Sequence, residues 1–245
     1  IMDNIARPAD YFDTNTLMNT LMVRAARKYN LKTFIGILST CIYPDVCKKG
    51  YPMKEEWLND GPPAKSNFSY GMAKRGLATQ IESYNTQFGT KYQYLIPANL
   101  FGPNDKYDDG KSHFVAALIK KIHTALQSGD KSITLFGTGK PKRQFVYSPD
   151  VAEIIKICLE ASIHVNMNIA NEEYTIDEIA NIALQACGAD HLKIKYDSSK
   201  PDGQYQKTVS NELLKDTLPG YTFTSLYDGI KRTFQHYSKN NSHAI

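Results

Sequence analysis

A tyrosine and a lysine spaced four residues apart form the first pair in this sequence that could carry out chemistry. Tyr70 and Lys74 stand at the two ends of the segment Tyr70-Gly-Met-Ala-Lys74, and residues with this spacing share one face of a helix. An ammonium group beside a phenol favours the phenolate, so we expect Lys74 to lower the pKa of Tyr70 below its usual value of about 10. Such a phenol can donate or accept a proton near neutral pH.

A serine and a cysteine lie about thirty residues before this pair, at the end of a run of apolar residues. The segment is Leu38-Ser39-Thr40-Cys41, and its serine hydroxyl can donate a hydrogen bond to a substrate carbonyl, as Tyr70 can. Cys41 by itself fits two roles, a small buried hydrophobic residue or a thiolate base with cations nearby. Tyrosine and lysine also occur four apart by chance on solvated helix faces, so the serine strengthens the catalytic interpretation.

Hydrophobic periodicity and turn residues predict an alternation of helices and strands around these residues. We expect helices at residues 10–29, 70–88, 112–127, 150–161, 225–237 and from Thr175, strands at 33–38, 92–96, 133–136, 145–147, 167–170 and 193–196, and a loop at 97–110. The expected caps are Gly89, Ser112 and the pair Thr175 and Glu178. Strands that alternate with helices build a parallel sheet covered on both faces, and ligands bind at the carboxyl ends of its strands.

Composition and charge narrow the classes of function. The chain has 245 residues and a net charge of +4, which is too mild to indicate a nucleic-acid partner but suits a small polyanionic ligand. The four cysteines form no CxxC pair and no zinc-spaced cluster with histidine, so we expect no metal. No apolar run approaches the ~20 residues that span a bilayer, and we expect a cytoplasmic protein with no membrane partner. In such a protein the acceptor pattern Asn67-Phe68-Ser69 would carry no sugar.

Six segments of the chain resemble the GDP-L-fucose synthases, which are extended short-chain dehydrogenases/reductases that act on sugar nucleotides. The segments agree with that family in order and spacing from Ser39 to Asn211, so the resemblance covers essentially the whole chain. They are STCIYP, NDGPPAKSNFSYGMAKR, IPANLFGPND, SHFVAALIKKIH, LFGTGKPKRQFVYSPD and DGQYQKTVSN.

The resemblance implies a fold, a reaction and a partner. The fold is α/β, a doubly wound Rossmann-type parallel sheet with a smaller α/β substrate-binding domain. Residues 1–103 would belong to the NADP-binding domain and residues 104–245 mainly to the GDP-sugar domain, with about 143–170 returning to the first. The reaction is the NADPH-dependent 3,5-epimerisation and 4-reduction of GDP-4-keto-6-deoxy-D-mannose. The protein would be a homodimer that pairs helices 10–29 and 70–88.

The resemblance also assigns roles to residues. Ser39, Tyr70 and Lys74 match the family's catalytic triad, and Cys41 and His113 match the pair that exchanges protons at C3 and C5, with the choice of base and acid left open. The residues that would contact the NADP(H) cofactor are Ser39, Tyr70, Lys74, Pro97, Asn99, Leu100 and His113. The residues that would contact the substrate are Asn99, Lys121, Phe136, Arg143 and Lys207.

Two of the substrate positions depart from the family pattern. The family often has arginine where Lys121 stands and tryptophan where Phe136 stands. Lysine keeps the positive charge but loses the bidentate grip of a guanidinium, and phenylalanine keeps the aromatic face but loses the indole donor. We therefore expect a change in substrate affinity or nucleotide preference. Arg143, which we place in a glycine-rich turn, offers a guanidinium that can bind a diphosphate or sugar hydroxyls.

No GxGxxG or GxxGxxG segment follows a first strand in this chain. In the family that loop holds the cofactor pyrophosphate, so we expect roughly the first quarter of the family chain, with the N-terminal half of the Rossmann sheet, to be missing. Two alternatives stay open. One is another extended family member, such as a UDP-sugar 4-epimerase or a dTDP-sugar dehydratase, against which Cys41 together with His113 argues. The other is a catalytically silent, dimerising subunit, against which the retained catalytic residues argue.

Overall fold

The computed structural model describes residues 2–108, 112–200 and 202–241, and the chain divides into two compact units. The first unit is Ile1–Ala98, Val151–Ala170 and Val209–Tyr221, and the second is Asn99–Asp150, Asn171–Thr208 and Thr222–Ile245. The chain thus returns to the first unit twice, whereas the sequence predicted one return over about residues 143–170. The assignment of the units to cofactor and substrate binding stays a prediction.

The first unit is built on a parallel sheet of three strands in the order β1-β2-β6. These strands are β1 (Ile35–Ile37), β2 (Gln93–Pro97) and β6 (Met167–Ile169). The register pairs Ile37 with Leu95 and Pro97 with Ile169. Every residue of β2 is buried, as expected for a central parallel strand whose two faces are both covered. The α/β class and these three predicted strands are confirmed.

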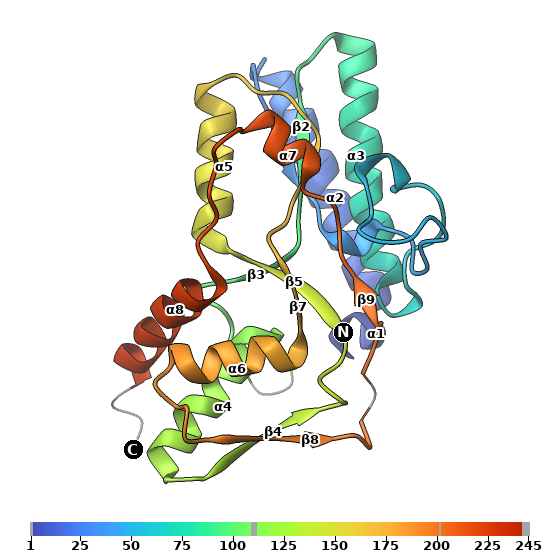
Figure 1. The fold of residues 1–245 in the computed structure, drawn as a ribbon. Coiled ribbons are helices and arrows are strands. Elements are labelled where there is room, and N and C mark those ends of the chain that lie inside the picture. The colour runs from blue at the N-terminus through green and yellow to red at the C-terminus, as the bar shows by residue number, and fades with distance from the viewer. Residues whose placement is uncertain (1, 109–111, 201, 242–245) are drawn as a thin grey trace. The chain divides into compact units, whose positions relative to one another are not determined.

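Helices of the first unit cover this sheet and set the position of the loop that follows β1. They are α1 (Met2–Ala6), α2 (Pro8–Lys28), α3 (Phe68–Phe88), α5 (Ser148–Glu160, from Val151) and α7 (Glu212–Thr217), with 3-10 turns η1 (Thr40–Ile42), η2 (Glu55–Trp57) and η3 (Lys65–Asn67). Helices α2 and α3 lie side by side, and α3 packs on β1 and β2 (Figure 1). As predicted, α3 ends at Gly89, whose φ of 65° is left-handed.

In its described residues, the second unit contains two small sheets and three helices around one core. In the larger sheet, β5 (Lys142–Tyr147) pairs with β3 (Asn99–Phe101), β7 (Glu173–Thr175) and β9 (Gln206–Lys207), and the smaller sheet pairs β4 (Ser132–Phe136) with β8 (Lys193–Asp197). The helices are α4 (Phe114–Ser128), α6 (Ile176–Ala186) and α8 (Leu226–Asn241). Their inward faces supply residues such as Ile119, Ile122, Ala183 and Ile230 to the apolar core.

Four local expectations differ from the structure. The predicted loop 97–110 contains the short strand β3. The sequence did not reveal it, because its strand partner β5 lies more than forty residues away. The N-cap of α4 is His113 rather than Ser112, and the His113 side chain makes no capping hydrogen bond. The pair of β5 with β7 is antiparallel, and α7 was not predicted. The Thr175–Glu178 capping box is confirmed.

No helix within the described ranges is both long and apolar enough to cross a membrane.

Candidate active site

Four of the predicted catalytic residues gather where β1 ends in the first unit. Ser39 follows β1 and caps η1, where its Oγ accepts a hydrogen bond from the backbone nitrogen of Cys41 at 3.3 Å. Tyr70 lies in the first turn of α3 and shares a side-chain hydrogen bond with Ser39. Lys74 lies one turn later, and its Nζ is 5.9 Å from the centre of the Tyr70 ring. The structure therefore brings Ser39, Cys41, Tyr70 and Lys74 together.

Helix α3 is fastened to the loop after β1 by cations that bond to backbone carbonyls. Lys74 Nζ donates to the oxygen of Ile37 at 2.9 Å. Arg75 donates through Nε to the oxygen of Ile42 at 2.5 Å and through Nη2 to the oxygen of Gly61 at 2.7 Å. A Cβ at Gly71 would lie only 2.7 Å from the carbonyl oxygen of Cys41. Only glycine permits this approach of the helix to the loop.

The expected effect of Lys74 on Tyr70 is wrong. Burial raises the pKa of Tyr70 to about 12, the charge of Cys41 adds to this, and the hydrogen bond with Ser39 opposes it. Lys74 does not lower this pKa, because its ammonium is directed to the Ile37 carbonyl. Burial also lowers the pKa of Lys74 itself. Tyr70 is thus a neutral phenol at physiological pH, which is the form that a proton donor requires.

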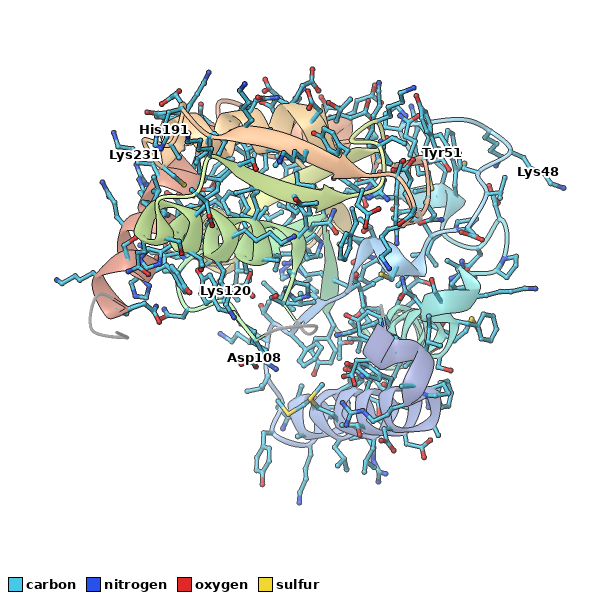
Figure 2. The ribbon with its side chains drawn as sticks, turned by 90° about the horizontal axis from the view of Figure 1, so that it is seen from below. Lys48, Tyr51, Asp108, Lys120, His191 and Lys231 are labelled. Carbon is cyan, nitrogen blue, oxygen red and sulfur yellow. The ribbon has the colours of Figure 1, made fainter. Side chains whose placement is uncertain are left out.

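His113 lies in the second unit, at the start of α4. Its side chain is 76% exposed, and its Nδ1 is 3.4 Å from Asp105 Oδ1. The hydrogen bond to this carboxylate raises the pKa of His113, although partial burial opposes the shift. Lys120 of α4, labelled in Figure 2, donates to the backbone oxygen of Tyr107 at 3.1 Å. This bond connects the segment before α4 to the helix. Because Cys41 belongs to the other unit, the predicted pairing of the two residues stays a prediction.

The predicted substrate residues of the second unit form two pairs. Lys121 donates to the backbone oxygen of Thr134 at 2.6 Å, and its Nζ lies 5.2 Å from the ring centre of the exposed Phe136. Arg143 and Lys207 are register partners on β5 and β9. Arg143 is therefore in a strand and not in the expected turn, and its guanidinium donates to the backbone oxygens of Lys142 and Gln204, each at 2.7 Å.

The remaining predicted cofactor residues lie around the end of β2 and in β3. Pro97 is the buried last residue of β2. Asn99 and Leu100 are exposed positions of β3, and Asn99 Nδ2 donates to the backbone oxygen of Gln144 at 2.8 Å. Pro97 thus lies at the carboxyl end of a parallel strand, where ligands bind, whereas Asn99 and Leu100 are the first two residues of β3. Their contact with a cofactor stays a prediction.

Sequence reasoning missed three groups that touch the catalytic side chains. Tyr11 of α2 packs edge-on against Tyr70, with ring centres 6.3 Å apart. Asn67 donates to the sulfur of Cys41, and Asp105 bonds to His113. No periodic pattern marks these positions. For Asn67 and Asp105 the sequence offered one sign, a polar residue a few positions before a predicted catalytic residue, whereas Tyr11 lies far from Tyr70 in sequence.

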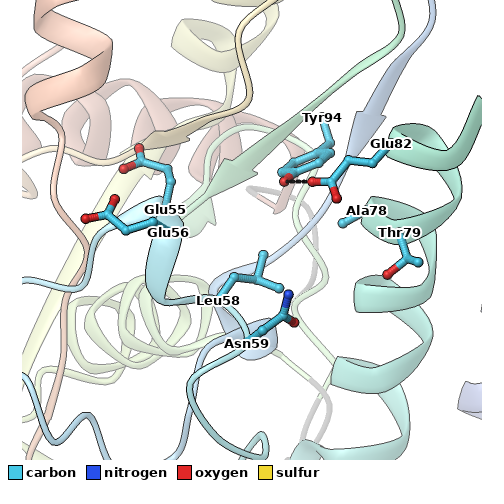
Figure 3. A pocket seen from close by; sticks show the side chains of 8 residues that line it. All are labelled: Glu55, Glu56, Leu58, Asn59, Ala78, Thr79, Glu82 and Tyr94. Carbon is cyan, nitrogen blue, oxygen red and sulfur yellow. Dashed lines mark hydrogen bonds between the residues drawn. The ribbon is translucent and has the colours of Figure 1, made fainter. Parts of the chain in front are cut away.

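A cleft of about 260 Å³ in the first unit does not contain any of these residues. It is lined by Glu55, Glu56, Leu58, Asn59, Ala78, Thr79, Glu82 and Tyr94 (Figure 3). Glu82 accepts a hydrogen bond from the Tyr94 hydroxyl, and Glu55 accepts one from the backbone nitrogen of Asn168, each at 2.8 Å. Its carboxylates would repel a nucleotide diphosphate, so we do not assign the cleft to the substrate.

Comparisons with known proteins point to one group of enzymes. A model of the NAD dependent epimerase/dehydratase family matches residues 1–170. A probable GDP-L-fucose synthase of Drosophila melanogaster is 35% identical over 100% of this chain and 78% of its own length. The GDP-L-fucose synthase of Dictyostelium discoideum is 34% identical over 98% of this chain and 75% of its own. A solved GDP-L-fucose synthetase from Naegleria fowleri bound to NADP has a TM-score of 0.86 at 31% identity, covering 96% of this chain and 74% of that one.

The bonds of Arg75 predict that Arg75→Met destabilises the catalytic loop. The substitution leaves the carbonyls of Ile42 and Gly61 without their guanidinium partner, and we expect the free energy of unfolding to fall by about 1–3 kcal/mol. Urea unfolding measures this change. Arg232→Met, at an exposed position of α8, is the matched control and should change stability by less than ~0.5 kcal/mol. Equal stability of the two variants would contradict the role assigned to Arg75.

The contact with Asp105 predicts that Asp105→Asn lowers the pKa of His113. The neutral amide no longer stabilises the imidazolium, so the pKa should fall back toward its usual value near 6.5. NMR titration of the His113 ring protons measures the shift. His123, on the same helix, has its pKa lowered by burial and provides the internal control, because its titration should not move. An unchanged His113 midpoint would show that Asp105 does not act on it.

Proposed function

The chain belongs to the NAD dependent epimerase/dehydratase family and, within it, to the GDP-L-fucose synthases, and we propose on this basis how its residues divide the reaction. It catalyses the NADPH-dependent 3,5-epimerisation and 4-reduction of GDP-4-keto-6-deoxy-D-mannose to GDP-L-fucose. The observation that carries the proposal is the grouping of Ser39, Cys41, Tyr70 and Lys74 at the end of β1. A triad alone would fit any reductase of this kind, and Cys41 beside it supplies a group for proton transfer at carbon.

The donors around Tyr70 fit an NADP(H) cofactor. An ammonium has three N–H donors, and one of those of Lys74 bonds to the Ile37 oxygen. Burial lowers the pKa of Lys74, and a partly buried cation gains from further acceptors such as ribose hydroxyls. Lys74 would therefore hold the nicotinamide ribose, with Tyr70 and Ser39 beside it. NADPH, when bound, supplies the hydride that reduces C4.

Reduction requires that Tyr70 deliver a proton to the C4 oxygen. Its pKa of about 12 keeps the phenol protonated across the neutral range. Ser39 donates a second hydrogen bond to the same oxygen, and both donors stabilise negative charge as it develops there. Ser39 lies close enough to Tyr70 to oppose the rise of its pKa, so the two donors are neighbours.

Epimerisation uses the same ketone. The C4 carbonyl acidifies the protons on C3 and C5, and inversion needs a base and an acid on opposite faces of the sugar. The Asp105 carboxylate raises the pKa of His113 and so favours its protonated form. This supports His113 as the acid and leaves Cys41 as the base. With His113 as the acid, activity should fall as the pH rises through its raised pKa.

The cytoplasmic location expected from the sequence stays a prediction.

Cys41→Ser is expected to stop epimerisation and to spare direct reduction of the ketone. A serine hydroxyl is a far weaker base than a thiolate, so proton exchange at C3 and C5 should slow by roughly 100-fold or more. NMR in deuterated water without NADPH measures that exchange, and NADPH oxidation measures the reduction to the unepimerised sugar.

Cys47→Ala is the matched control for this substitution. Cys47 is buried and lies six residues after Cys41 in the same segment. The control should keep both activities within about threefold of the unmodified chain, since neither role is assigned to it. Exchange at the unmodified rate in Cys41→Ser would rule out Cys41 as the base.

The same family context supports a homodimer through α2 and α3. On α2 the exposed fractions of Leu17, Met18, Leu21 and Met22 are 63%, 50%, 53% and 55%. The spacing of four within each pair places them along one side of the helix, and Met72 of α3 is also exposed. An apolar stripe of this extent marks a contact surface. A second copy of the chain is the occupant that we propose, since a two-fold axis pairs one such stripe with its equal.

The double substitution Leu17→Glu and Leu21→Glu is expected to produce a monomer. It places two like charges per chain at the centre of the stripe, where burial in the dimer would be costly. Sedimentation velocity of the unmodified and substituted chains measures the change. Leu159→Glu, at a 50% exposed position of α5, is the control and should leave the dimer intact. A monomeric unmodified protein would overturn the proposal.

A further inference from the structure

The sulfur of Cys41 has a hydrogen-bond donor that the proposed reaction does not yet use. Asn67 is the last residue of η3 and stands directly before α3, three positions ahead of Tyr70. Its Nδ2 donates to Cys41 Sγ at 3.5 Å. The sequence marked Asn67 only as the start of an acceptor pattern for sugars, whereas the structure directs its amide to the catalytic segment.

A second asparagine fixes which end of that amide faces the sulfur. Asn4 of α1 donates through Nδ2 to Asn67 Oδ1 at 3.1 Å, and α1 packs against η3. A side-chain amide has an accepting end and a donating end. Because Asn4 occupies the accepting end, the N–H groups of Asn67 are left to point toward Cys41.

We propose that Asn67 is a positioning residue for Cys41, holding its sulfur and stabilising the thiolate form, and that Asn4 sets the direction of the Asn67 amide. A hydrogen bond to the charged form of an acid favours that form, and bonds to an ionised acceptor are the stronger ones. The catalytic consequence rests on the proposed function. There the sulfur takes a proton from C3 or C5, and the electrons of the broken C–H bond move to the C4 oxygen as an enolate.

Tyr70, Lys74 and Ser39 also lie near Cys41. Tyr70 faces it as a neutral phenol, because its pKa is raised to about 12. Lys74 directs its ammonium to the Ile37 oxygen, and Ser39 accepts from the backbone of Cys41. Beyond Tyr70, the hydroxyl of Tyr11 donates to Asp3 at 2.7 Å, and Asp3 pairs with Arg7 at 2.6 Å. The Asn67 amide is a neutral donor in contact with the sulfur itself.

The alkylation of Cys41 by iodoacetamide tests this proposal in the absence of cofactor and substrate. Cys41 is partly exposed, whereas Cys47, Cys158 and Cys187 are buried, so peptide mapping of the native protein isolates its rate. In Asn67→Leu we expect the midpoint of the pH–rate profile to rise by about one pH unit and the rate at pH 7 to fall roughly tenfold, the loss expected for one hydrogen bond to an anion.

Asn85→Leu, on α3, is the matched control. Asn85 bonds to the backbone of Tyr92 and to Thr90, so its substitution also costs stability but leaves Cys41 alone. Its alkylation midpoint should equal that of the unmodified protein. A midpoint that rises equally in both variants would show that lost stability, and not the Asn67 donor, moves the profile.

Asn4→Asp tests whether the direction of the amide matters. A carboxylate at position 4 accepts where Asn4 donates, so the Asn67 amide should turn and present its oxygen to the sulfur. We expect the alkylation midpoint to rise as in Asn67→Leu although position 4 does not contact Cys41. Combined with Asn67→Leu, Asn4→Asp should add only the small effect of its charge, because the coupling runs through Asn67.

Two results would overturn the proposal: an unchanged midpoint in Asn67→Leu, or an equal shift by Asn4→Asp with and without Asn67. Neither result depends on the reaction, since alkylation requires no NADPH and no sugar nucleotide. Solvent exchange at C3 and C5 reports separately on the proposed function. If Cys41→Ser stops that exchange while Asn67→Leu leaves the alkylation profile unchanged, the function stands and the role of Asn67 fails.

Discussion

The approach of α3 to the loop after β1 is the constraint on which the proposed catalytic residues depend. At Gly71 the helix passes so close to the Cys41 carbonyl that no side chain fits. Lys74 and Arg75, in the next turn, donate hydrogen bonds to backbone carbonyls on both sides of that loop. These bonds join one turn of α3 to Ile37 at the end of β1 and to Ile42 at the end of η1. The spacing of Tyr70 from Ser39 and Cys41 therefore cannot change without breaking them. The triad is thus positioned by backbone contacts of its own neighbours.

The same approach determines the ionisation of Tyr70. Bringing the phenol against the loop and against Tyr11 removes it from water, and burial is the largest cause of its raised pKa. The spacing of Tyr70 and Lys74 had favoured a lowered pKa instead. A lysine four residues away lowers the pKa of a tyrosine only if its ammonium stays near the hydroxyl. The Ile37 carbonyl draws that ammonium elsewhere. Packing therefore reverses the direction of the Tyr70 pKa shift, and sequence spacing alone does not reveal this packing.

Long periodic elements and the caps at Gly89 and Thr175 could be predicted from the sequence, and so could the gathering of Ser39, Cys41, Tyr70 and Lys74. Both depend on local spacing and on the rule that strand ends meet at one edge of a sheet. The short strands β3, β7 and β9 could not be predicted well, since two or three residues carry no periodic pattern and β3 and β9 depend on the distant β5. Asn67 and Asp105 were missed for a similar reason. Their roles come from contacts made in the fold.

The two residues to which we assign proton transfer, His113 and Cys41, also illustrate how a chain can tune a base and an acid by different means. His113 gains a carboxylate partner, which favours a cation. Cys41 gains an amide donor, which favours an anion without adding a net charge beside it. A lysine in place of Asn67 would favour the thiolate more strongly, but it would also favour the phenolate of Tyr70, and an ionised phenol has no proton to give in the reduction. A neutral donor favours the thiolate while Tyr70 stays protonated, so one cluster of residues can serve both halves of the reaction.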